Sequence, residues 1–235
     1  MKNLIIASTS TVHGSGYLEY LLPELEVFFK NVSEIVFIPY ARPSGISHND
    51  YTQIAKAAFS KINKSVKGIH EYSNPVNAIK NAQAIFVGGG NTFVLAYQLY
   101  KNGLINILKE TVNNGTPYLG TSAGSNICGL TIKTTNDMPI VYPPSFNALG
   151  LVPFNINPHY LDPDTTSKHM GETRETRIKE FHAYNTPPVI GLREGSWLQV
   201  TGRSIVLKGE LLARIFKYNT PAYEVEPETE LKDLK

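Results

Sequence analysis

The chain has 235 residues, of which 42% are hydrophobic and 18% charged, a balance typical of one large globular domain or two small ones. The 22 basic and 20 acidic side chains leave a net charge of +2 and form no block of like charge, which argues against a nucleic-acid or anionic-membrane partner. The single cysteine, Cys128, excludes a disulfide framework within the chain and a cysteine-rich zinc site.

The first half of the chain alternates short apolar runs with segments of helical periodicity. Strands are expected at 3–8, 34–40, 65–70, 84–90 and 117–122. Helices are expected at 17–30, 50–63, 74–82, 92–103 and 104–115, the second one capped by Asn49 or Asp50. Because this alternation gives right-handed βαβ units, it predicts a parallel sheet flanked by helices, with ligands bound at the carboxyl ends of the strands.

After about residue 130 the pattern changes to proline-rich loops, one helix and short strands. The helix is expected at 171–185, and the strands at 188–192, 196–209 and 212–218, with a hairpin at 200–207. The last residues, about 224–235, read as a polar tail. We therefore expect a single α/β domain over residues 1–235, with short antiparallel strands near the C-terminus. No apolar run reaches the roughly 20 residues of a membrane helix, and the N-terminal apolar run is far too short for a signal peptide, so we expect a cytoplasmic protein.

The stretch 120–124, Gly-Thr-Ser-Ala-Gly, follows a predicted strand and precedes an apolar helical start. A serine on such a sharp strand-to-helix turn has an exposed hydroxyl, and its small neighbours fit the cramped backbone. The same letters could equally describe a tight turn with a capping serine. On this context the sequence leaves Ser122 open as either a nucleophile or a turn residue.

A nucleophilic serine needs a base and a group that orients that base. Among the six histidines, His159 lies in a loop fixed by prolines on both sides, as a positioned base would require. Candidate carboxylates are Asp137, Asp162, Asp164 and Glu194, and the residues alone favour none of them. An oxyanion hole could come from backbone amides of the Gly88–Gly90 run and of Ala123. That run lacks the spacing of a nucleotide-binding loop.

Several separated blocks resemble one family: FVGGGNTF, GTSAGSNI, INPHYLDP, GETRETRI and GLREGSWL. In order and spacing, over nearly the whole chain, they are similar to the peptidase E family of serine peptidases, the α-aspartyl dipeptidases, which are related to cyanophycinases. The resemblance implies a flavodoxin-like parallel sheet of the class I glutamine amidotransferase type. It also implies a catalytic triad of Ser122, His159 and Glu194, with Asp137 as the competing third member or as a substrate ligand.

The reaction that the resemblance implies is hydrolysis of dipeptides with an N-terminal aspartate. Arginine binds carboxylates through two parallel hydrogen bonds, so Arg174 and Arg177, with Asn91, are the candidate substrate-binding residues, and Arg42 is a weaker one. The oxyanion hole is assigned to Gly89, Gly90 and Ala123. We expect no cofactor and no metal, a small dipeptide as the partner, and a monomer or weak homodimer.

Three alternatives follow from the same residues. A cyanophycinase-like peptidase would share the triad but cleave β-aspartyl bonds in an open groove. An α/β-hydrolase esterase would place its acid before its histidine, unlike the order Ser122, His159, Glu194. A non-enzymatic amidotransferase-like binding domain is the third alternative. Glutaminase chemistry is not favoured because the nucleophile position holds Ser122, and Cys128 lies too far along the following helix.

Overall fold

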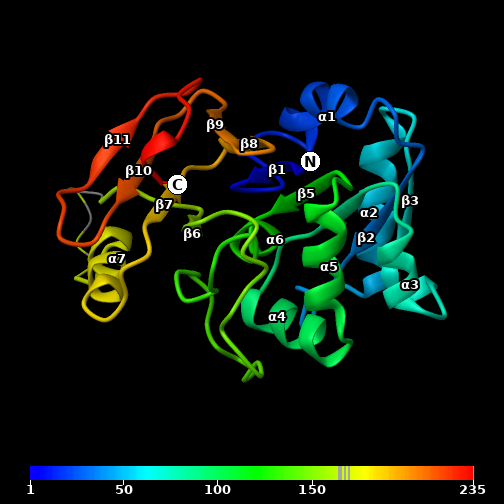
Figure 1. Ribbon diagram of the computed structural model, residues 1–235, viewed down its shortest axis with the longest axis horizontal. Helices are drawn as coiled ribbons and strands as arrows, with labels where there is room; N and C mark the ends of the chain where they lie inside the picture. The colour runs from blue at the N-terminus through cyan, green and yellow to red at the C-terminus, as the bar shows by residue number, and fades with distance from the viewer. Residues whose placement is uncertain (164–165, 167, 169, 235) are drawn as a thin grey trace.

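The computed structural model describes residues 1–163, 166, 168 and 170–234 (Figure 1). Asp164, one of the carboxylates considered from the sequence, lies outside these residues. Within the described residues, no helix is long and apolar enough to cross a membrane.

The main sheet has seven strands in the order β3-β2-β4-β5-β1-β8-β9 (Figure 1). Five of them are parallel, as the alternating pattern predicted: β1 (Asn3–Ala7), β2 (Glu34–Ile38), β3 (Ser65–Gly68), β4 (Ile85–Val87) and β5 (Tyr118–Thr121). The hairpin of β8 (Trp197–Thr201) and β9 (Ser204–Lys208) extends the sheet antiparallel to β1. The main sheet as a whole is therefore mixed, because the late hairpin joins the edge that β1 leaves open.

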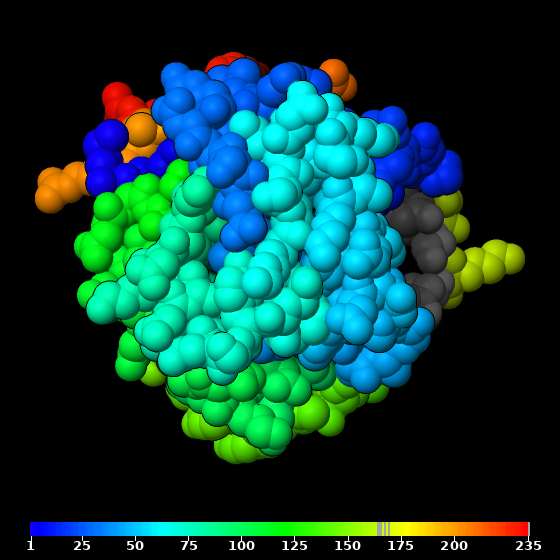
Figure 2. Space-filling view, turned by 90° about the vertical axis from the view of Figure 1, so that its right-hand side faces the viewer, coloured from blue at the N-terminus to red at the C-terminus, as the bar shows by residue number. Residues whose placement is uncertain are grey.

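Helices cover both faces of this sheet. A 3-10 helix (Glu19–Leu21), α1 (Leu22–Phe28) and α2 (His48–Ser60) pack on one face. On the other face lie α3 (Pro75–Lys80), α4 (Thr92–Lys101) and α5 (Leu104–Asn113). Side chains of the central strands alternate between the two faces, so that Ile5 of β1 lies in the core with α1 and α2, and Leu4 of β1 lies in the core with α3, α4 and α5. Figure 2 views the molecule from the side beyond β3, where blue-to-cyan segments cover most of the centre of the surface and green segments lie below them.

A second sheet of four strands has the order β11-β10-β7-β6. Its strands are β6 (Asn155–Pro158), β7 (Val189–Leu192), β10 (Ala213–Phe216) and β11 (Tyr223–Val225). β6 and β7 are parallel, whereas β10 is antiparallel to both β7 and β11. α7 (Arg174–His182) lies beside this sheet and packs Ile178 against it (Figure 1).

Two local predictions were wrong. Ser47 caps α2 by accepting a hydrogen bond from the Asp50 N–H, so the helix begins before the expected cap residues. The C-terminal segment is not a free tail, because β11 pairs with β10, and Leu231 and Leu234 are buried. The few apolar residues among its charges are enough to bury this segment against the β8–β9 hairpin. There the Leu231 N–H donates a hydrogen bond to the Ile205 carbonyl.

Candidate active site

Ser122 lies on the sharp turn between β5 and the short helix α6 (Ala123–Asn126). Its backbone has φ 55° and ψ −111°, a strained conformation for a residue other than glycine. The motif glycines make this turn possible: a Cβ on Gly120 would collide with the carbonyl of Gly124, and one on Gly124 would collide with the carbonyl of Val87. The strand–turn–helix context that the motif needs is therefore present.

His159 and Glu194 come from neighbouring parallel strands, since His159 follows β6 and Glu194 follows β7 just after the pair Pro158 and Leu192. The carboxyl ends of parallel strands meet at one edge, which brings the two side chains together. His159 Nε2 lies 2.8 Å from Ser122 Oγ, and His159 Nδ1 lies 2.6 Å from Glu194 Oε1. The three side chains form one continuous hydrogen-bonded chain, with the imidazole between hydroxyl and carboxylate.

A buried serine of β1's carboxyl end ties these segments together. Ser8 is fully buried; its hydroxyl accepts a hydrogen bond from the His159 N–H at 2.9 Å and donates to the Leu192 carbonyl at 2.7 Å. The Tyr160 N–H also donates to that carbonyl, at 3.1 Å. His159 itself has φ 53°, so its backbone also occupies the left-handed region. The main sheet therefore holds, through Ser8, the two strand ends that carry His159 and Glu194.

The glycine run after β4 lies against Ser122. A Cβ on Gly89 would come within 2.9 Å of the Ser122 Cβ, so only glycine fits this approach. The Gly89 N–H is already occupied, because it donates to the Tyr51 hydroxyl at 3.0 Å. The amides of Gly90 and Ala123 have no hydrogen-bond partner among the described residues. Of the three predicted oxyanion donors, two are available in this structure and Gly89 is not.

Asp137, the competing third member, lies at the start of α4 and not at His159. Its Oδ2 accepts hydrogen bonds from the Thr92 N–H at 2.7 Å and from the Thr135 hydroxyl at 2.9 Å. Among the described residues, His159 Nδ1 is hydrogen-bonded only to Glu194. The structure thus brings Glu194 to the imidazole and leaves Asp137 beside the glycine loop.

The two candidate arginines lie in the first turns of α7. Arg174 is half-buried and Arg177 exposed, and neither side chain makes a hydrogen bond or ion pair with a described residue. Burial, followed by the nearby charge of Arg177, lowers the pKa of Arg174, while the charge of Asp137 acts in the opposite direction. Two guanidinium groups whose charges interact, and which form no ion pair with a described carboxylate, make a site that an anion would stabilise.

The other two polar candidates have structural partners. Asn91 caps α4 by accepting from the Val94 N–H at 3.1 Å, and its amide donates to the Met138 carbonyl at 2.9 Å. Arg42 lies with its guanidinium carbon 5.0 Å from the centre of the Tyr51 ring. Asn91 therefore connects the glycine loop to the Asp137 segment. Its side-chain oxygen and nitrogen are both hydrogen-bonded to backbone groups of the protein.

The profile of peptidase family S51 matches residues 4–208 of the chain. The chain belongs to peptidase family S51. It is 48% identical to Peptidase E of Streptomyces coelicolor over 99% of this chain and 94% of that protein. It is also 47% identical to the "probable alpha-aspartyl dipeptidase" of Drosophila melanogaster, over 99% of this chain and 97% of that protein. Among solved structures, a peptidase from an acI-B1 Actinobacterium has the same fold, with a TM-score of 0.71, 18% identity and coverage of 98% of this chain and 96% of that one.

The one cysteine of this family S51 chain cannot replace Ser122. Cys128 is fully buried, its thiol lies 3.3 Å from the Gly124 carbonyl, and burial raises the pKa of the thiol to about 12. The thiol is therefore protonated at neutral pH and inert. Among the described residues, no group of three or more His, Cys, Asp or Glu side chains is placed to hold a metal ion.

Sequence reasoning missed Ser8 and Tyr51. Each contacts a segment of the candidate active site that is far away in the chain, 151 residues for the bond from His159 to Ser8 and 38 for the bond from Gly89 to Tyr51. One signal for Ser8 was present, because it follows a predicted strand at the sheet edge where the motif residues were expected. Tyr51 carried no comparable signal, since it reads as one more apolar residue of a helix.

Proposed function

We propose that this chain is a serine dipeptidase that hydrolyses dipeptides with an N-terminal aspartate. The observation that carries the proposal is the hydrogen-bonded chain from Ser122 through His159 to Glu194. The names of relatives that are 47–48% identical over nearly the whole chain, Peptidase E and "probable alpha-aspartyl dipeptidase", support the substrate class. A mixed α/β sheet with five parallel strands supports the flavodoxin-like, amidotransferase-type core as part of the proposal.

In the proposed mechanism Ser122 Oγ attacks the scissile carbonyl carbon while His159 Nε2 takes the hydroxyl proton. Glu194 holds the imidazole in the tautomer that carries its proton on Nδ1 and stabilises the imidazolium that forms. The amides of Gly90 and Ala123 are the proposed donors to the oxyanion. His159 then protonates the departing amine, and a water molecule, deprotonated by the same nitrogen, releases aspartate from the acyl-enzyme and restores Ser122.

The proposed specificity rests on the charges beside the triad. A dipeptide with N-terminal aspartate presents an ammonium group and a β-carboxylate within a few ångströms of the scissile bond. Asp137 is the proposed partner of the ammonium group, and Arg174, with Arg177 near it, is the proposed partner of the β-carboxylate. The unpartnered guanidinium groups support this assignment, because no described carboxylate forms an ion pair with them.

The test is cleavage of Asp-Leu, Glu-Leu, Ala-Leu and a β-aspartyl dipeptide by the wild type and by Ser122→Ala. We expect cleavage of Asp-Leu alone and a loss on the order of 10⁶ in kcat on removal of the nucleophile. Preferred cleavage of the β-aspartyl dipeptide would identify a cyanophycinase-like peptidase instead. No cleavage of any dipeptide would favour a binding domain.

The roles of the two carboxylates are separated by Glu194→Gln and Asp137→Asn. We expect Glu194→Gln to lower kcat by about 10⁴, because the imidazole loses its orienting anion, and Asp137→Asn to raise KM for Asp-Leu. An inactive Asp137→Asn protein beside an active Glu194→Gln protein would reverse the assignment of the third triad member.

A further inference from the structure

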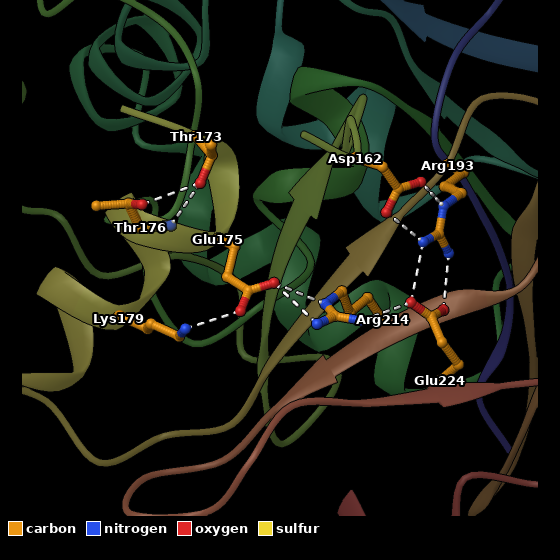
Figure 3. Close-up of polar contacts among 8 residues, drawn as sticks. All are labelled: Asp162, Thr173, Glu175, Thr176, Lys179, Arg193, Arg214 and Glu224. Atoms are coloured by element: carbon orange, nitrogen blue, oxygen red, sulfur yellow. Dashed lines mark hydrogen bonds and ion pairs between the residues drawn. The ribbon is translucent and has the colours of Figure 1, made fainter. Parts of the chain in front are cut away.

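Five charged side chains of alternating sign form a continuous chain beside the active site: Asp162, Arg193, Glu224, Arg214 and Glu175 (Figure 3). Arg193 makes two bonds to Asp162, at 2.9 and 2.7 Å, and two to Glu224, at 2.9 and 3.0 Å. Arg214 bonds to Glu224 at 2.9 Å and to Glu175 at 3.0 Å. Because guanidinium–carboxylate pairs of this kind fix orientation as well as distance, the chain is a rigid connection between the segments it joins.

The Arg193 end of the chain joins the two segments that carry the base and its orienting carboxylate. Arg193 directly precedes Glu194, and Asp162 lies three residues after His159. The Arg193 guanidinium also lies 5.4 Å from the centre of the Tyr160 ring and donates to the Leu212 carbonyl at 2.7 Å. Its side chain is only 15% exposed, so these bonds are partly shielded from solvent.

The Arg214 end of the chain reaches α7. Glu175 accepts from Arg214 on β10 and also pairs with Lys179 one turn further along the helix, at 2.8 Å (Figure 3). Glu175 is the neighbour of Arg174, which carries no ion pair of its own among the described residues. The bond between Glu175 and Arg214 therefore fixes the rotation of the helix turn from which Arg174 extends.

We propose that Arg193 and Arg214 are positioning residues with separable tasks, Arg193 holding His159 against Glu194 and Arg214 aiming Arg174 at the substrate carboxylate. The inference deepens the proposed function and rests on it for the role of Arg174. Arg193 is needed because the backbone of His159 has a left-handed conformation, which a residue other than glycine rarely adopts unless its surroundings hold it there. Ser8 fixes the backbone amide of His159, and Arg193 fixes the residues that follow it.

The two tasks predict different kinetic signatures. In Arg193→Met, kcat for Asp-Leu should fall about 10- to 100-fold with KM within about twofold, because displacement of a base by an ångström costs this much. The rate at which a fluorophosphonate labels Ser122 should fall by a similar factor, since labelling needs the base but not the carboxylate receptor. In Arg214→Met, KM for Asp-Leu should rise about tenfold, while the labelling rate stays within about twofold of wild type.

Lys208→Met is the matched control, because Lys208 pairs with Glu228 at 2.6 Å on β9 and belongs to neither segment. Its kcat, KM and labelling rate should match the wild type. Arg193→Lys keeps the positive charge but loses the paired hydrogen bonds of the guanidinium, so it should label Ser122 about three- to tenfold more slowly than the wild type. This variant decides the question if Arg193→Met does not fold.

Two results would overturn the inference. One is an Arg193 variant that labels at the wild-type rate, and the other is a pair of Arg193 and Arg214 variants with the same change in kcat and KM. A wild-type protein that cleaves Asp-Leu and accepts the label establishes the proposed function independently of either result. A wild-type protein that cleaves no dipeptide overturns the proposed function, and one that cleaves Asp-Leu but resists the label overturns the inference alone.

Discussion

Replacing Ser8 with alanine removes one buried hydroxyl from the contact between the main sheet and the strand ends that carry His159 and Glu194. The Leu192 carbonyl keeps its bond from the Tyr160 N–H, but the His159 N–H loses its partner at 2.9 Å. A buried donor left without a partner costs about 1–3 kcal/mol. For a chain of this size each kcal/mol lowers Tm by about 2–4 °C, so Tm should fall by roughly 2–12 °C.

The same substitution should also lower catalysis, because His159 is freed to move relative to Ser122. We expect kcat for Asp-Leu to fall by about 10- to 100-fold, with little change in KM. The assay is steady-state hydrolysis of Asp-Leu together with thermal unfolding followed by circular dichroism. Ser10→Ala is the control, because the Ser10 side chain makes no hydrogen bond to a described residue. A Ser8→Ala protein with wild-type Tm and wild-type kcat would refute the reasoning.

Four further predictions concern other parts of the site. Gly124→Ala should abolish folding or activity, since the new methyl group would meet the Val87 carbonyl, and recovery of an active, soluble variant would contradict this. Tyr51→Phe should lower kcat by about 5- to 50-fold, because the Gly89 N–H loses its acceptor beside Ser122; an unchanged kcat would show that Tyr51 does not support the glycine loop. Thiol reagents should leave the folded protein active and unlabelled and should react only after unfolding, because Cys128 is buried with a raised pKa. Hydrogen bonds from Arg193 lower the pKa values of Asp162 and Glu224 in the folded state, so this stabilisation is present above about pH 4–5 and is lost as the pH falls through the lowered values. The difference in Tm between wild type and Arg193→Met should accordingly be constant near neutral pH and shrink below about pH 4, as measured by unfolding across a pH series.

The parallel half of the fold and the position of Ser122 could be predicted because they depend on local patterns. Apolar runs of strand length alternate with helical periodicity, and the motif glycines mark a turn where side chains cannot fit. The mixed character of the sheet could not be predicted this way, since nothing in the hairpin's own sequence says that it pairs with β1. The burial of the C-terminal segment could not be predicted for a different reason: its charged residues outnumber the few apolar residues through which it is buried.

The triad shows where local reasoning stops. His159 was favoured from its fixed loop, but Glu194 looked like the glutamate of an ordinary turn and was chosen only through resemblance to a known family. The structure supplies what the residues could not, a parallel pairing of β6 and β7 that places both at one strand edge. Gly89 differs from the prediction because its amide is bonded to a tyrosine on a distant helix. The cytoplasmic location and the oligomeric state stay predictions.

The proposed catalytic groups come from two different sheets, and this has a consequence for inactivation. The main sheet carries Ser122, whereas the second sheet carries His159 and Glu194. A partial opening that parts the two sheets would expose the core that they share and disconnect the proposed base from its nucleophile, while the core under α1 and α2 stays intact. Enzymatic activity should therefore disappear at lower denaturant concentration than the bulk of the secondary structure. In this molecule, turnover therefore reports whether the second sheet remains packed against the main sheet.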